Sequence, residues 1–212
     1  MPDWKEDPKP AFQGILSLYE SSPAAFRNEK ESVVRQKLFE PMFKALGFAA
    51  APGKGAGSGA DDHDYLLHAP DAPAQPLALC LTYPWARSLD GKDYQRDSET
   101  SEENPGALVV SLLERGAAAW AIVTNGKIWR LYSQRTHSRA TNYYEIDLEE
   151  VLAQDRHYSA DIAESFRYFW LLFRRQAFES RPAELEVAGK PPSFLDILVT
   201  GSEQYARELG ER

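Results

Sequence analysis

The chain has 212 residues, of which 43% are hydrophobic and 26% charged, and its formal net charge is −8. This size and composition predict one soluble globular domain with a small extension. No stretch approaches the eighteen or so apolar residues of a membrane span, and the first ten residues lack the apolar run of a secretory signal, so we expect a cytoplasmic protein without a membrane partner. The single cysteine, Cys80, excludes an internal disulfide and a cysteine-based zinc cluster.

Net negative charge argues against a protein that simply coats DNA, because nonspecific affinity comes from Lys and Arg side chains that neutralise phosphates. The charge is nevertheless segregated along the chain. Residues 127–144 carry four Lys and Arg side chains and no acid, whereas residues 90–103 carry six acids. The basic stretch is either a solvated hairpin end or a nucleic-acid-binding edge.

Apolar spacing predicts a short helix over residues 12–19 and a longer helical stretch over 23–46. Gly47 is placed to end the second of these. Pro41 lies inside it and cannot donate to the helical hydrogen-bond ladder, so we expect a kink or a helix restart there.

Two strands are predicted next, over 63–69 and 77–83, joined by a proline-rich turn over 70–76. The glycine-rich run 53–59 precedes them. We interpret this run as a loop, because Pro52 rather than a strand comes before it and no phosphate-binding motif is complete.

The second half of the chain alternates predicted strands and helices. Pro105 suits the start of a helix that ends at Gly116. Asn125-Gly126 favours a tight hairpin turn between a buried strand around Trp120 and the alternating run 128–132. The other predicted elements are a loop over 90–104, a strand over 143–148, helices over 149–152, 160–178 and 194–209, and a linker over 181–192, with no obvious packing partner left for the last helix.

Five segments, in this order, resemble the N-terminal nuclease-like domain of type IIG restriction-modification fusions and related type I restriction proteins. They are Arg35 to Phe48 (RQKLFEPMFKALGF), His63 to Leu67 (HDYLL), Thr124 to Tyr132 (TNGKIWRLY), Tyr143 to Leu148 (YYEIDL) and Phe166 to Phe173 (FRYFWLLF). The resemblance implies an α/β, restriction-endonuclease-like fold over residues 1–180, in which helices flank a mixed β-sheet. It also implies that the C-terminal helical extension, 181–212, begins a connector to a DNA methyltransferase domain or subunit.

The resemblance places Asp64 at the family's catalytic aspartate. Metal-dependent phosphodiester hydrolysis needs carboxylates on adjacent strands to hold Mg²⁺, and a lysine beside them to position the attacking water. The family's Glu-x-Lys falls here on Cys80-Leu81-Thr82, where alternation puts Cys80 and Thr82 on one face. A thiol is a poor ligand for a hard cation, and a hydroxyl cannot replace an ammonium group. Asp64 is therefore predicted to be the vestige of a catalytic and metal-binding site.

Three functions stay open at this point. The first is a restriction-modification module, catalytically inactive or impaired, that contributes inter-domain coupling or DNA contacts. Its candidate DNA-binding residues are Lys127, Arg130, Arg135 and Arg139. The second is an active Mg²⁺-dependent endonuclease that uses Asp64 with a relocated helix carboxylate, Glu31 or Glu29, and a loop lysine, Lys54 or Lys92. The third is a structural or oligomerisation domain that does not bind DNA. Mg²⁺ is the expected cofactor only in the second case.

Overall fold

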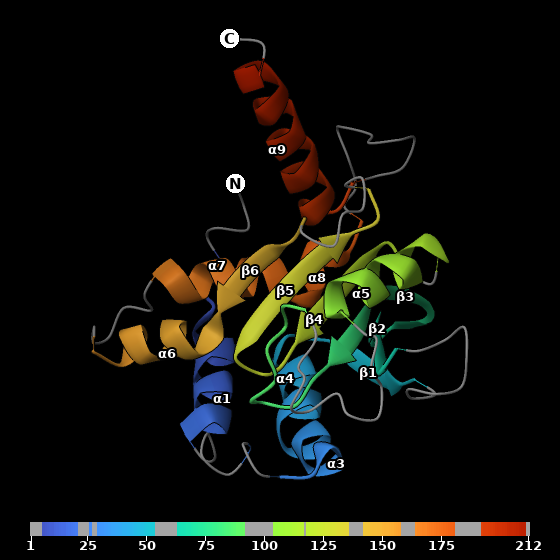
Figure 1. The fold of residues 1–212 in the computed structure, drawn as a ribbon. Helices are drawn as coiled ribbons and strands as arrows, with labels where there is room; N and C mark the ends of the chain where they lie inside the picture. Colours follow the sequence, from blue (N-terminus) through green and yellow to red (C-terminus); the bar gives the residue numbers. More distant parts are fainter. Residues whose placement is uncertain are drawn as a thin grey trace.

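Six β-strands form one mixed sheet in the computed structural model, which describes residues 6–20, 26, 29–53, 63–91, 104–116, 118–135, 142–157, 164–180 and 192–210 (Figure 1). The strands follow one another across the sheet in chain order: β1 (Ala49–Pro52), β2 (Tyr65–Ala69), β3 (Ala72–Thr82), β4 (Trp120–Thr124), β5 (Ile128–Ser133) and β6 (Tyr144–Asp147). Neighbouring strands are antiparallel except for β3 and β4, which are parallel. A parallel pair needs a crossover, which contains helix α5 (Pro105–Glu114).

Helices cover both faces of the sheet (Figure 1). One face packs against most of them, and the other packs against α5. The first group comprises α1 (Lys9–Glu20), the helical stretch α3 (Glu31–Val34), η2 (Arg35–Phe39) and α4 (Glu40–Ala45), then α6 (Leu148–His157), α7 (Glu164–Phe173) and α8 (Arg175–Phe178). The predicted α/β class, with a mixed sheet flanked by helices, is thus confirmed. No helix in the described ranges is long and apolar enough to cross a membrane.

Alternation along β3 separates two hydrophobic cores. Ala78 and Cys80 belong to the larger core, whereas Leu79 and Leu81 belong to the core beneath α5. The two faces predicted from the sequence are therefore correct. At the centre of the larger core Trp129 is fully buried, and its ring centroid lies 6.4, 5.5 and 5.6 Å from those of Phe43, Phe169 and Phe173.

The helical stretch around Pro41 changes its hydrogen-bond pattern, and α4 begins afresh at Glu40, so the helix restart that the sequence allowed is confirmed. The N–H of Glu40 donates to the carbonyl of Arg35, five residues earlier, so a π-helical segment widens the helix immediately before the proline. Pro41 then occupies the first turn of α4, where a missing N–H costs little. The predicted end at Gly47 is confirmed: Gly47 has a φ of +89°, and Phe48 N–H donates to Phe43 O at 2.9 Å, closing a Schellman motif.

Strand boundaries in the first half differ from the sequence prediction. Residues 49–52 form the edge strand β1, so the interpretation that no strand precedes the glycine-rich run is wrong. Pro52 is tolerated there because an edge strand leaves some N–H groups unpaired. β3 begins at Ala72, which shortens the predicted turn to Pro70 and Asp71. The pairing of β2 with β3 shifts in register around His68, and this irregularity accommodates Pro73 and Pro76 of β3.

The β4–β5 hairpin forms where Asn125-Gly126 predicted it, with a longer loop than a two-residue turn. Thr124 and Trp129 are the innermost paired residues. Asn125 acts through its side chain, because its Oδ1 accepts hydrogen bonds from the N–H groups of Lys127 and Ile128 at 3.0 and 2.9 Å. Gly126 supplies the positive φ, +88°.

Two helices near the C-terminus also depart from prediction. The expected helix over 160–178 is split at Arg174, whose backbone is extended. Burial explains the break: the Arg174 side chain is 1% exposed, pairs with Glu6 at 2.5 Å and stacks on Trp170. The last helix, α9 (Phe194–Gly210), does have a packing partner, contrary to expectation. Leu195 and Val199 join the larger core, while the rest of α9 projects from the body (Figure 1).

Candidate functional site

Asp64 lies in a bend immediately before β2, where it reaches across to the end of β3. Its N–H donates to Cys80 O at 3.0 Å. Its Oδ2 accepts hydrogen bonds from the backbone N–H of Thr82 at 2.6 Å and from the Thr82 hydroxyl at 3.1 Å. The structure therefore brings together Asp64 and the strand position at which the resemblance would require a lysine.

The other carboxylate oxygen of Asp64 is paired with a cation from the helical layer. Arg35, in the π-helical segment η2, donates from Nη2 to Asp64 Oδ1. The Arg35 and Asp64 side chains are 26% and 12% exposed. The guanidinium also lies 5.8 Å from the ring centroid of Tyr65. Arg35 thus supplies positive charge next to the carboxylate that a divalent ion would bind.

Cys80 faces the larger core and has no route to solvent. Its side chain is fully buried, and Tyr65 is its partner residue on β2. Burial, followed by the negative charge of Asp64, raises the pKa of the Cys80 thiol well above its ordinary value. The thiol therefore stays protonated at neutral pH and is neither a hard-metal ligand nor a nucleophile.

The carboxylates and lysines considered as substitutes are placed only in part. Residue 31 begins α3 one helical turn before Arg35, and Glu29 is exposed just ahead of it. Lys54 and Lys92 lie outside the described residues. Within the described ranges, no group of three or more His, Cys, Asp or Glu side chains could hold a metal ion.

Arg130 is the most internally engaged of the predicted DNA-binding residues. Its side chain is 5% exposed, and it donates to Glu145 at 2.6 Å, Leu89 O at 2.9 Å and Asp90 at 2.7 Å. It also stacks 4.3 Å from the ring centroid of Tyr143. Burial by itself would lower the pKa of Arg130, but the hydrogen bonds with Glu145 and Asp90 raise it. Arg130 therefore binds residues 89 and 90, in the segment after β3, to strands β5 and β6.

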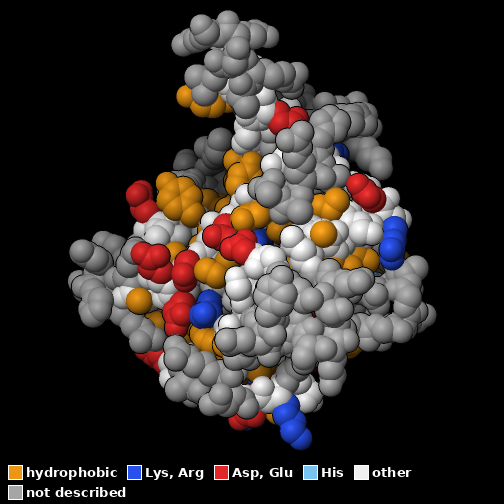
Figure 2. Space-filling model, in the orientation of Figure 1, with side chains coloured by type: hydrophobic (Ala, Val, Ile, Leu, Met, Phe, Trp, Pro, Cys, Tyr) orange, Lys and Arg blue, Asp and Glu red, His pale blue; other side chains and the backbone are white. Residues whose placement is uncertain are grey.

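The other basic candidates are dispersed. Arg135 follows β5 and pairs with Asp196 at 3.1 Å, which joins the sheet to α9. Lys127 is half-buried in the hairpin loop, and Arg139 lies outside the described residues. Acidic side chains gather on the neighbouring face, over β6 and the start of α6 (Figure 2). The described part of the hairpin is thus no continuous basic edge.

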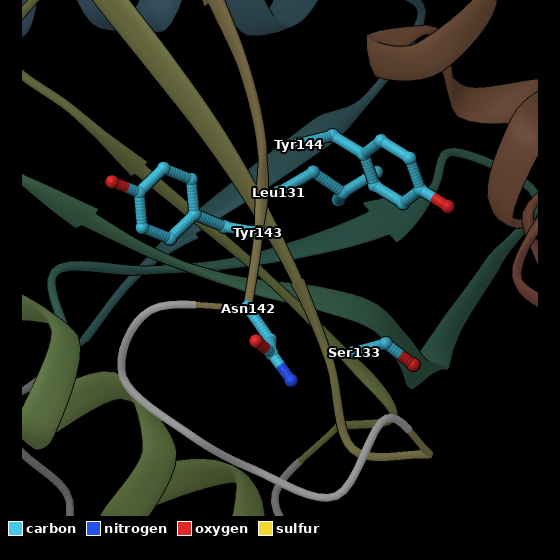
Figure 3. A pocket seen from close by; sticks show the side chains of 5 residues that line it. All are labelled: Leu131, Ser133, Asn142, Tyr143 and Tyr144. Atoms are coloured by element: carbon cyan, nitrogen blue, oxygen red, sulfur yellow. The ribbon is translucent and has the colours of Figure 1, made fainter. Parts of the chain in front are cut away.

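A shallow pocket of about 210 Å³ lies at the end of β5 and the start of β6, and it is lined by Leu131, Ser133, Asn142, Tyr143 and Tyr144. Figure 3 shows the two tyrosine rings pointing to opposite sides of β6. None of the lining side chains carries a charge at neutral pH. The pocket therefore offers hydroxyl, amide and aromatic surface but no acid–base or metal chemistry.

Comparison with protein-family models, with curated proteins and with solved structures gave no match. The site is interpreted from its own geometry. Sequence reasoning located Asp64, Cys80 and Thr82 but missed Arg35, which no motif marks as their neighbour. It also gave no sign that residues 83–91 are bound to the sheet. Asn125 Nδ2 donates a hydrogen bond to Arg87 O at 2.8 Å, and Arg130 donates one to Leu89 O.

Proposed function

We propose that this chain is a restriction-endonuclease-like module that no longer cleaves DNA and that serves a restriction-modification system by inter-domain coupling. The proposal rests on the bonding partners of the Asp64 carboxylate. One oxygen binds the Arg35 guanidinium, and the other binds the backbone and hydroxyl of Thr82. Arg35 and Thr82 satisfy Asp64 without Mg²⁺, and neither can supply the second carboxylate that metal-dependent hydrolysis requires.

Coupling is favoured over DNA contact because two of the four basic candidates already pair with acids of this chain. Arg130 binds Asp90 and Glu145, and Arg135 binds Asp196. The Arg135–Asp196 pair joins α9 to the end of β5, and Tyr144 Oη, on β6, lies 3.1 Å from Ser202 Oγ on the same helix. A displacement of α9 would therefore act directly on β5 and β6.

An active endonuclease is the second candidate, and the position of residue 31 favours it. Residue 31 begins α3 one helical turn before Arg35, and positions four apart in an α-helix lie on one side of it. Asp64 would have to release Arg35 before the two carboxylates could share a metal ion.

Calorimetric titration with Mg²⁺ and Mn²⁺, with plasmid cleavage measured on the same samples, separates these two functions. The wild-type protein is expected to show neither metal binding nor cleavage, and Arg35→Gln, which frees Oδ1 of Asp64, is expected to remain without cleavage. Metal-dependent cleavage by the wild type that is lost in both Asp64→Ala and Glu31→Gln would replace the proposal with the active endonuclease.

DNA affinity is tested separately, by fluorescence anisotropy over a range of salt concentrations. Phosphate contacts release counterions, so genuine DNA binding weakens steeply as salt rises. A coupling module or scaffold is expected to bind weakly or not at all. Tight, salt-dependent binding that Lys127→Gln weakens would instead assign DNA contact to the hairpin.

A further inference from the structure

The pocket at the end of β5 and the start of β6 has a buried floor and an exposed rim. Leu131 and Tyr144 are paired across the two strands, and Ser133 lies two residues beyond Leu131, so these three side chains share one face of the sheet. Figure 3 shows them on one side of the strands and the Tyr143 ring on the other. Leu131 and Ser133 are 1% and 6% exposed, Tyr144 is half-buried and Asn142 is exposed. The floor is therefore aliphatic with one hydroxyl, one wall is aromatic, and the rim carries an amide.

This lining selects a small, uncharged ligand. None of the described lining side chains carries a charge at neutral pH, so a charged group that left water here would gain no counter-ion. A purely apolar ligand would cover the Ser133 hydroxyl and the Asn142 amide without offering either a hydrogen bond. The volume of about 210 Å³ lies below the roughly 300–1,000 Å³ of pockets for drug-sized molecules. The ligand that fits is a single small ring system with hydrogen-bonding groups on its edge.

An adenine base combines these properties. It is flat and uncharged, and one of its edges presents a donor, N6, beside an acceptor, N7. A side-chain amide presents an acceptor and a donor at matching spacing, so Asn142 is equipped to bind this edge with two hydrogen bonds while the base lies against Tyr144. A purine with a 6-oxo group presents two acceptors on the same edge and leaves the amide oxygen without a partner.

We propose that this pocket binds the adenine base of a nucleoside. Acidic side chains gather over β6 and the start of α6 (Figure 2), and they repel the phosphates of a nucleic acid. A free nucleoside is therefore favoured over a base that belongs to a strand. The pocket is shallow and covers only part of such a ligand, so the dissociation constant is expected to be about 1 mM.

A ligand in the pocket also lies next to the contacts that hold α9. Tyr144 Oη lies 3.1 Å from Ser202 Oγ, and Ser133 Oγ accepts a hydrogen bond from the Arg135 N–H at 3.1 Å. The Arg135 side chain pairs in turn with Asp196, in the first turn of α9. A base that fixes Tyr144 and Ser133 is therefore expected to slow amide hydrogen exchange over residues 194–202. This effect on α9 rests on the coupling function proposed above, whereas binding of the base does not.

Titration of the full chain with adenosine, followed by the NMR chemical shifts of the protein, tests the site. Inosine, in which a 6-oxo group replaces the amino group of adenosine, is expected to bind about tenfold more weakly. Asn142→Asp keeps the shape of the side chain but cannot donate to N7, and it is expected to weaken adenosine binding about tenfold. Gln13→Ala removes an exposed amide from α1 and should leave the affinity unaltered.

The outcomes separate the site from its coupling. No binding of adenosine, equal affinities for adenosine and inosine, or an unchanged affinity in Asn142→Asp would each overturn the nucleobase site. A short dA oligonucleotide that binds more tightly than adenosine, with a steep dependence on salt, would assign the base to a nucleic acid and overturn the nucleoside. Selective binding of adenosine without slower exchange over residues 194–202 would confirm the site and contradict coupling through α9.

Discussion

Removal of the Arg35 guanidinium measures how far the Asp64 carboxylate depends on its internal cation. Losing one partner of a fully buried ion pair costs about 3–5 kcal/mol, because a charge is left without compensation. Here Arg35 is 26% exposed, and Thr82 still donates two hydrogen bonds to Asp64. We therefore expect Arg35→Met to lower the free energy of unfolding by about 2 kcal/mol. For a chain of this length that loss corresponds to a fall in unfolding temperature of about 4–8 °C.

Urea unfolding, followed by tryptophan fluorescence and analysed by linear extrapolation, gives the value. The double variant Arg35→Met with Asp64→Leu should lose less than the sum of the two single variants, because neither charge is then left alone. Lys37→Met is the matched control: it removes an exposed cation from the same helical segment and should cost under about 0.5 kcal/mol. A loss below about 0.5 kcal/mol for Arg35→Met, or strict additivity in the double variant, would show that the pair contributes little.

Three further changes have defined outcomes. Gly126→Ala puts a methyl group at a φ of +88° and 2.9 Å from buried side chains, and should cost about 2–4 kcal/mol in thermal unfolding. Gly116→Ala, at +81° in open space, should cost only about 1–2 kcal/mol, so equal losses would contradict the close packing. Cys80 should resist thiol reagents until urea unfolds the chain. Because its pKa is raised in the folded state, the thiol contribution to stability is complete below about pH 8.5 and declines above it by up to about 1.4 kcal/mol per pH unit. Cys80→Val should abolish this decline, and an unchanged pH dependence would refute the assignment. Arg130→Met should accelerate amide hydrogen exchange in residues 83–91 and cost about 3 kcal/mol, whereas Arg135→Met, which is more exposed, should cost under about 1 kcal/mol.

The features that the sequence predicted correctly are those set by interactions between near neighbours in the chain. Gly47 ends a helix because it adopts a positive φ, and Pro105 begins one because its missing N–H is not needed in the first turn. Alternation along β3 is a property of extended backbone, so the faces occupied by Cys80 and Leu81 followed from their parity alone. The run Cys80-Leu81-Thr82, at the strand position where the resemblance would place Glu-x-Lys, is likewise readable from the sequence itself.

Only the tertiary structure decided which charges meet. Arg35 and Asp64 are 29 residues apart, and Arg130 and Asp90 are 40 apart. Basic residues on a hairpin have the same sequence pattern whether they face phosphates or acids of their own chain. The break at Arg174 is also a long-range effect, because local apolar spacing favours a continuous helix, whereas the buried Arg174 guanidinium pairs with Glu6, far away in the chain, where the backbone is extended. Local propensities set most of the elements, whereas the packing of distant segments decided which acids the Arg35, Arg130 and Arg174 side chains meet.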